Sequence, residues 1–137
     1  MTQTRISAAL RREVRERARE RCEYCLLAES QAFFPHEPDH LIATKHGGET
    51  ISANLVLACF DCNRFKGPNI ASLDPVTGEL VSLFNPRTQR WSEHFKLNGG
   101  TIVPLTPVGP VTEKMLRLNL SVRAAARERW FALGLYP

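Results

Sequence analysis

The sequence lacks any apolar run that could cross a bilayer. Runs such as residues 55–60 are far shorter than the roughly 20 residues that a membrane-spanning helix needs. The opening residues MTQTRISAALRRE also lack the apolar h-region of a secretory signal, and the chain has no internal repeat or low-complexity tract. These absences argue against a membrane or secreted protein and predict a soluble, cytoplasmic one.

The length of the chain limits the number of domains. The chain has 137 residues, of which 43% are hydrophobic. This is typical of one compact domain with a small appendage, and a second large core is not expected. We therefore expect a single domain over residues 1–137.

Cysteine is scarce, and all four cysteines stand in two Cys-x-x-Cys pairs, Cys22/Cys25 and Cys59/Cys62. In a secreted protein they could form two disulfides, but this spacing without an apparent signal favours a structural Zn²⁺ site. Four thiolates suit a closed tetrahedral zinc site. Because such a site keeps no open position for water, hydrolysis at the cysteines themselves is a poor alternative.

Basic charge is concentrated at the start of the chain. The net charge is +4, and seven of the 18 Lys and Arg residues lie within the first 21 positions. Clustered arginine attracts a polyanion without reading its sequence. The alternative is a solvated helix face, since Glu13, Glu16 and Glu20 stand three or four residues from several of these arginines.

Local patterns predict the elements of the first half of the chain. Ser7 is a plausible N-cap for a basic helix over residues 8–21, with Leu10, Val14 and Ala18 on one stripe. Further along, we expect extended backbone over 39–42, a turn at 47–48, a strand over 55–58, and a short helix from Cys62 that ends at Gly67.

Residues 68–137 form a C-terminal extension in which the signals are weaker. Asn98-Gly99-Gly100 indicates a hairpin turn, and three prolines lead to a helical tail. The expected elements are strand-like or mixed segments at 80–84 and 91–97, a strand at 101–103, a stiff connection over 104–110, and helices at 112–118 and 121–133.

The run EPDHLIATKHGGETISANLVLACFDCNRFKG resembles the motif of zinc-bearing HNH endonucleases. The resemblance covers residues 22–67 best. It is carried by the order Asp-His, Gly-Gly, Asn-Leu and Cys-x-x-Cys-Asn-x-x-Lys, which is far more specific than a single Cys-x-x-Cys. The stretch LFNPRTQRWSEHF and the ending GLYP are also similar to bacterial members of the family, although no chemistry can be assigned to them.

The resemblance implies an α+β fold with a treble-clef-like ββα-metal core. In this arrangement a reactive histidine ends the first strand, and a metal ligand lies on the helix. The family name expects a final histidine where this chain has Asn63, and H-N-N variants also occur in the family. The implied activity is metal-dependent hydrolysis of phosphodiester bonds in DNA, with RNA as the alternative substrate.

The residues support this chemistry on physical grounds. His40 is the best general base, because an imidazole can take a proton from water near neutral pH. Asp39 and the amide oxygen of Asn63 suit a hard cation such as Mg²⁺ or Mn²⁺. As neighbours on an extended strand, Asp39 and His40 should project to opposite faces, so a bulge or twist is needed if both serve one site.

The remaining candidates have supporting roles. The resemblance makes Asn54 the middle residue of the motif, and its amide could tie the loop across the hairpin and orient His40. The alternative for Asn54 is a simple Asx turn. The side chains of His46, Arg64 and Lys66 could bind phosphate or face water.

A non-catalytic, zinc-containing nucleic-acid-binding module is the main alternative function. It explains the cysteines and the arginines. It leaves Asp39, His40, Asn54 and Asn63 without a common purpose, which is why a nuclease is the preferred interpretation.

Overall fold

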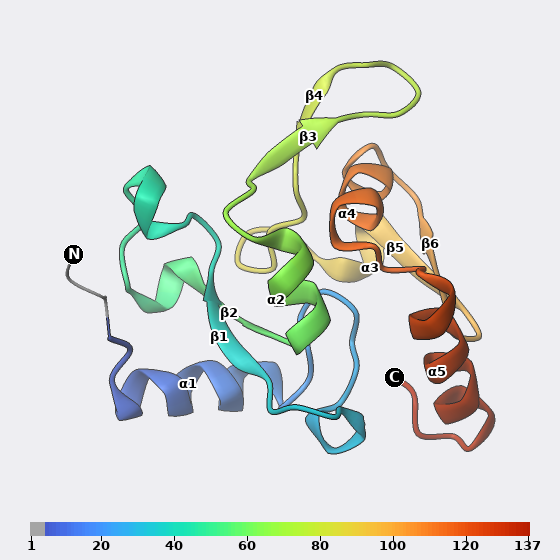
Figure 1. Cartoon of the computed structure of the whole chain (residues 1–137), viewed down its shortest axis with the longest axis horizontal. Helices are drawn as coiled ribbons and strands as arrows, with labels where there is room; N and C mark the ends of the chain where they lie inside the picture. The colour runs from blue at the N-terminus through green and yellow to red at the C-terminus, as the bar shows by residue number, and fades with distance from the viewer. Residues whose placement is uncertain (1–4) are drawn as a thin grey trace.

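A computed structural model describes residues 5–137 and contains both helices and strands (Figure 1). The chain therefore has the mixed helix and strand content expected of an α+β protein. In chain order the elements are α1 (Ala8–Ala18), η1 (Glu29–Gln31), β1 (Glu37–His40), η2 (Thr44–His46), η3 (Ser52–Asn54), β2 (Leu55–Ala58), α2 (Phe60–Lys66), β3 (Ala71–Leu73), β4 (Leu80–Ser82), α3 (Trp91–His94), β5 (Phe95–Asn98), β6 (Thr101–Pro104), α4 (Val108–Leu116) and α5 (Ser121–Ala132).

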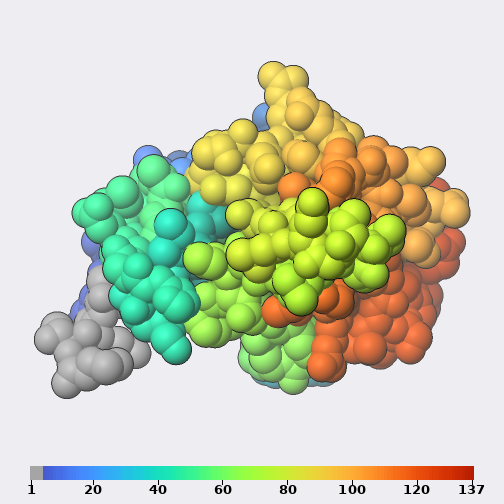
Figure 2. Space-filling view, turned by 90° about the horizontal axis from the view of Figure 1, so that it is seen from above, coloured from blue at the N-terminus to red at the C-terminus, as the bar shows by residue number. Residues whose placement is uncertain are grey.

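The strands of the described residues form three separate antiparallel pairs, β1–β2, β3–β4 and β5–β6. The first pair runs directly into α2, which lies between this hairpin and α4 (Figure 1). Strand β2 is buried along its whole length, whereas the loop that joins β1 to β2 projects from the body of the molecule (Figure 2). The hairpin and α2 are the elements that carry the candidate site.

Helix α1 begins as the sequence predicts but ends earlier. The hydroxyl oxygen of Ser7 accepts a hydrogen bond from the backbone N–H of Leu10 (3.1 Å) and caps the helix. Arg19 then adopts a left-handed conformation with φ of 54°, so the helix stops at Ala18 and does not continue to residue 21. Its apolar stripe packs on β2, since Val14 is buried against Leu55 and Leu57.

Arginines of α1 hold the hairpin and the segment before it in place. Arg15 donates to Glu29 at 2.6 Å, and Arg17 donates to the backbone oxygen of Leu55 at 2.7 Å. Arg11 forms an ion pair with Glu37 at 3.0 Å. The sequence suggested either phosphate binding or pairs within the helix. Instead, these three arginines contact distant segments, so much of this basic charge has a structural role.

The C-terminal extension packs against the first half of the chain. The main core contains the four cysteines together with residues of the extension such as Phe84, Phe95 and Ile102. The hairpin turn at residues 98–100 is as predicted, with Asn98 paired to Thr101. Three details differ from the expectation: residues 91–94 are helical, residues 71–73 form an additional strand, and the first tail helix starts at Val108 and includes Pro110 in its first turn.

Across residues 5–137, we find no helix with the length and apolar character needed to span a membrane.

Candidate functional site

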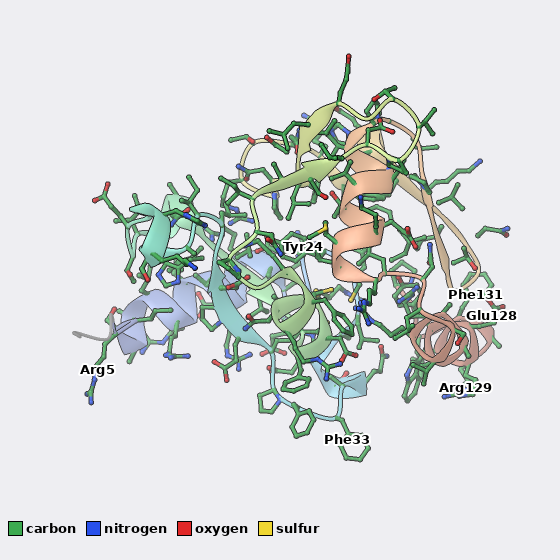
Figure 3. The ribbon with its side chains drawn as sticks, turned by 45° about the horizontal axis from the view of Figure 1, so that its top comes forward. Arg5, Tyr24, Phe33, Glu128, Arg129 and Phe131 are labelled. Atoms are coloured by element: carbon green, nitrogen blue, oxygen red, sulfur yellow. The ribbon has the colours of Figure 1, made fainter. Side chains whose placement is uncertain are left out.

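The four cysteines converge on one point. The Sγ atoms of Cys22, Cys25, Cys59 and Cys62 lie within 4.8 Å of one another, and all four side chains are buried. The two pairs come from different places, a turn after α1 and the start of α2. Four sulfur donors at this separation fit a tetrahedral zinc ion. Figure 3 shows sulfur atoms near the centre of the molecule, close to Tyr24.

Arg123 supplies positive charge beside this cluster. Its Nη2 lies 3.0 Å from Cys62 Sγ and 3.7 Å from Cys59 Sγ. Burial alone would lower the pKa of Arg123, but the neighbouring thiolates raise it above its ordinary value. A zinc ion with four thiolates carries a net charge of −2, so a buried guanidinium at this place offsets part of it. The sequence contained no spacing signal for this residue, because Arg123 lies about 60 positions further along the chain.

The stretches of the extension that resemble family members support the same cluster. The indole N–H of Trp91 donates to the backbone oxygen of Tyr24 at 2.9 Å. The hydroxyl of Tyr136 donates to the backbone oxygen of Cys25 at 2.6 Å. Both bonds fix the backbone between the first two cysteines, so these stretches contribute to the geometry of the cysteine cluster.

His40 ends β1, and a hydroxyl in the following loop fixes its ring. Its Nε2 lies 2.9 Å from Thr50 Oγ1. Burial lowers the pKa of His40, and the nearby charge of Lys66 lowers it further. A histidine with a lowered pKa is neutral at pH 7 and can accept a proton. If Nε2–H donates to Thr50, the nitrogen left free to accept is Nδ1. Sequence reasoning missed Thr50.

Asn54 ties the loop across the hairpin. Its Oδ1 accepts a hydrogen bond from Ile42 N at 2.9 Å, and its Nδ2 donates to the backbone oxygens of Ile42 at 3.0 Å and Glu49 at 2.8 Å. These are the contacts of a loop clamp and go beyond a simple Asx turn. Gly48 lies in the same clamp, since a Cβ there would meet Ile42 O at 1.7 Å. The loop therefore needs glycine at position 48.

Asp39 lies on the side of β1 that faces α2. Its Oδ2 is 3.9 Å from Lys66 Nζ. This oxygen is buried and has no hydrogen-bond partner among the described residues. Burial raises the pKa of Asp39 to about 6, even though Lys66 and the backbone N–H of His40 favour the charged form. A buried carboxylate oxygen without a donor is a suitable ligand for a hard cation.

The strand that carries these residues is regular. Asp39 pairs with Val56 and His40 with Leu55 in an uninterrupted antiparallel register. Strand β1 therefore has no bulge that would turn both side chains to one face. Asp39 contacts Lys66 of α2, whereas the His40 ring contacts the loop beyond the strand end.

Asn63 lies in the middle of α2 and is half-buried. Lys66, three residues further on, reaches Asp39. Residues three apart are neighbours on a helix surface, so Asn63 adjoins the face of α2 from which Lys66 reaches β1. This placement is compatible with a second oxygen ligand near Asp39.

Lys66 differs from the phosphate contact that the sequence suggested. Its side chain is 2% exposed, and its ammonium donates to the backbone oxygens of His40 at 3.1 Å and Leu41 at 3.2 Å. Burial lowers the pKa of Lys66, and Asp39 opposes this shift. Lys66 therefore holds the end of β1 against α2. Its ammonium points into the protein.

The other basic candidates remain accessible. His46 and Arg64 are exposed, and Arg64 forms an ion pair with Asp61 at 3.4 Å. By contrast, His36 is fully buried, with Nε2 at 2.8 Å from the backbone oxygen of Leu27. His36 is thus a structural residue.

Replacing Thr50 tests whether its hydroxyl orients His40. We expect Thr50→Val to lower the rate of any His40-dependent reaction about tenfold, which matches the loss of one hydrogen bond of about 1.4 kcal/mol. Thr50→Ser keeps the hydroxyl and should retain most of the rate. Single-turnover rates of both variants at saturating protein provide the measurement. Equal rates for the two variants would mean that the hydroxyl does not orient the ring.

Comparison with known proteins gives one family. Residues 22–69 match the family model described as HNH endonuclease. The match confirms the resemblance seen in the sequence, and it includes both cysteine pairs, β1, β2 and α2. Searches of curated proteins and of solved structures returned no match.

Proposed function

From the HNH endonuclease match over residues 22–69, we propose that this protein is a metal-dependent endonuclease that hydrolyses phosphodiester bonds in DNA. In this proposal β1, β2 and α2 form a ββα-metal site, and a structural Zn²⁺ held by the four cysteines keeps it rigid. The structural observation that carries the proposal is the pairing of His40 with Asp39. A neutral His40 stands at the end of β1 beside Asp39, whose buried oxygen lacks a donor among the described residues.

His40 acts as the general base. In this proposal the Nε2–H of His40 donates a hydrogen bond to Thr50 Oγ1, which leaves Nδ1 to take a proton from the attacking water. The lowered pKa of His40 keeps the ring in its basic form at neutral pH. Asn54 maintains this geometry, since it fixes the loop that carries Thr50 through Glu49 and Ile42.

Asp39 and Asn63 are the residues that would hold the catalytic Mg²⁺ or Mn²⁺. The carboxylate oxygen of Asp39 that has no hydrogen-bond partner and the amide oxygen of Asn63 are the kind of oxygen ligand that such an ion binds. A divalent cation there supplies charge to stabilise the phosphorane and the departing oxygen. Lys66 holds β1 and α2 together, which keeps these two residues on facing elements.

A plasmid assay tests the proposed activity. Supercoiled DNA is incubated with the protein in Mg²⁺, in Mn²⁺ and in EDTA, and the nicked and linear forms are quantified. We expect strand breaks only with an added divalent cation. Zinc content is measured after each incubation, so that loss of structural zinc is not mistaken for loss of the catalytic ion. DNA binding without strand breaks in any metal would favour the non-catalytic zinc-containing module.

Asp39→Asn tests the cation site through stability. Folding raises the pKa of Asp39 from 3.8 to about 6. As pH rises, Asp39 therefore loses its proton at a lower pH in the unfolded chain than in the folded protein. The free energy of unfolding falls between about pH 4 and 6, and the full loss is present above that range. At pH 7 the destabilisation has an upper bound of about 3 kcal/mol. Without Mg²⁺, Asp39→Asn should unfold at a higher temperature than the wild type.

Added Mg²⁺ should reverse this order. The cation raises the unfolding temperature of the wild type by binding its carboxylate, and it leaves Asp39→Asn nearly unchanged. Thermal unfolding at pH 7 with and without Mg²⁺ gives the comparison. An equal response of both proteins to Mg²⁺ would exclude Asp39 as a ligand.

A further inference from the structure

Three exposed aromatic rings form a continuous surface beside α2. Phe33, Phe34 and Phe60 are 98%, 52% and 47% exposed. Their ring centroids lie 5.9 Å apart for Phe33–Phe34 and 4.8 Å apart for Phe34–Phe60. Figure 3 shows the Phe33 ring pointing away from the body of the molecule. We call Phe33, Phe34 and Phe60 the aromatic platform.

Positive charge adjoins the platform. The guanidinium of Arg64 lies 5.4 Å from the Phe60 centroid and 4.6 Å from the Phe65 centroid. The guanidinium of Arg117 lies 5.0 Å from the Phe65 centroid as well. Asp61 pairs with Arg64 at 3.4 Å and with Arg123 at 3.7 Å, so its negative charge is offset.

The platform borders a pocket of about 410 Å³. The opposite wall belongs to α5, where Val122 and Ala126 contribute apolar surface. Scattered exposed apolar residues are ordinary, whereas a contiguous aromatic patch beside a pocket indicates a binding surface. The pocket and the rings together offer a flat apolar floor with a cationic edge.

The segment that carries Phe33 and Phe34 is firmly anchored. The backbone N–H of His36 donates to Glu29 at 2.7 Å, and Arg15 donates both to Glu29 at 2.6 Å and to the backbone oxygen of His36 at 3.2 Å. The buried His36 ring anchors the same segment to Leu27. The exposure of the two phenylalanines is thus a fixed feature of the fold.

We propose that the aromatic platform stacks unpaired bases of DNA next to the cleavage site, which makes single-stranded or locally distorted DNA the preferred substrate. This inference rests on the proposed nuclease function. Bases have π faces that stack on aromatic rings regardless of sequence, and arginines at the edge suit the phosphates between them. An apolar peptide would match the rings but would not use the cationic edge.

The position of the platform agrees with this occupant. Phe60 and Asn63 are three residues apart on α2, which is on the order of 5 Å along the helix axis. A strand whose phosphate lies at Asp39 and Asn63, and which runs along α2 toward its first residue, passes Phe60 within one or two nucleotides. Its neighbouring bases reach the platform only if they are unpaired.

A binding assay without cleavage tests the platform. His40→Ala protein, free of Mg²⁺, is titrated with a single-stranded oligonucleotide that contains 2-aminopurine, and with the matching duplex. Adding Phe34→Ala should weaken single-strand binding roughly tenfold and remove most of the stacking-dependent quenching. Duplex binding should change little. Phe131→Ala is the matched control, since Phe131 is a comparably exposed ring on α5 (46%) outside the pocket lining.

The outcomes separate this inference from the proposed function. Zinc content and thermal unfolding first establish that each variant is folded, and Phe33→Ala serves as a second platform variant. Unchanged quenching and affinity in both variants would overturn the platform, even if the wild type cuts plasmid DNA. If these variants lose self-association while DNA binding is unchanged, the surface is a contact between copies of the chain. That result would also overturn the proposal that the platform stacks bases. Weakened single-strand binding without any plasmid cleavage by the wild type would support the platform and overturn the nuclease.

Discussion

Replacing His40 by alanine is expected to leave a folded, zinc-bound protein whose DNA cleavage is slower by a factor of about 10² to 10⁴. This is the range that a positioned general base contributes to a hydrolytic rate. The His40 ring is only partly buried, and its Nε2 contacts the hydroxyl of Thr50 in the loop that joins β1 to β2. Removing the ring therefore removes the proposed base without opening the core.

A second variant separates proton transfer from positioning. His40→Gln keeps a polar side chain of similar reach that can still contact Thr50, but an amide cannot take a proton from water. We expect it to be as slow as His40→Ala. Rates are measured by single turnover on plasmid DNA in Mg²⁺, and folding is followed by zinc content and unfolding temperature. Cleavage by His40→Ala within threefold of the wild type would remove His40 from the mechanism.

The sequence was sufficient to predict the structure at positions where the local geometry requires one residue type. The Cys-x-x-Cys pairs predicted a cluster that the structure contains. Ser7 caps α1, and the Gly47-Gly48 turn lies where a side chain at Gly48 would collide with Ile42. In each case a short spacing or a backbone restriction determines the structure, so neighbouring residues contain the information.

The sequence was insufficient where a long side chain has several possible partners. Lys66 and the arginines of α1 could equally face a phosphate or a carbonyl. The choice depends on segments that only folding brings near, such as the end of β1 for Lys66 and Glu29 for Arg15. The same reason hid Thr50, Arg123 and the aromatic platform. Their importance comes from contacts across the fold, and no spacing in the sequence encodes them.

Cys59→Ser is expected to cost the protein its zinc and its folded structure. A tetrathiolate zinc contributes on the order of 10 kcal/mol to folding in small zinc domains. A typical domain has a total stability of only about 5–15 kcal/mol. The four cysteines lie in the main core and connect the turn after α1 to α2. Loss of one ligand therefore weakens the contacts on which both β1 and α2 depend.

Serine at position 59 makes this a clean test of metal binding. Cys59 is also the N-cap of α2, where its Sγ accepts a hydrogen bond from Cys62 N at 3.4 Å. Serine is a favoured N-cap, so Cys59→Ser keeps the cap and removes only the thiolate ligand. Any loss of structure then reports on zinc. Zinc content by mass spectrometry and the unfolding temperature give the two measurements.

Arg123→Gln provides a graded comparison. It retains all four thiolates and removes the guanidinium that lies 3.0 Å from Cys62 Sγ. We expect this variant to bind zinc but to lose it to a chelator faster than the wild type, because the negative charge of the cluster is less well offset. His40→Ala should resist the chelator as the wild type does. If Cys59→Ser retains one zinc and unfolds at the wild-type temperature, the cysteines do not hold the fold through a metal, and the rigid scaffold required by the proposed active site needs another origin.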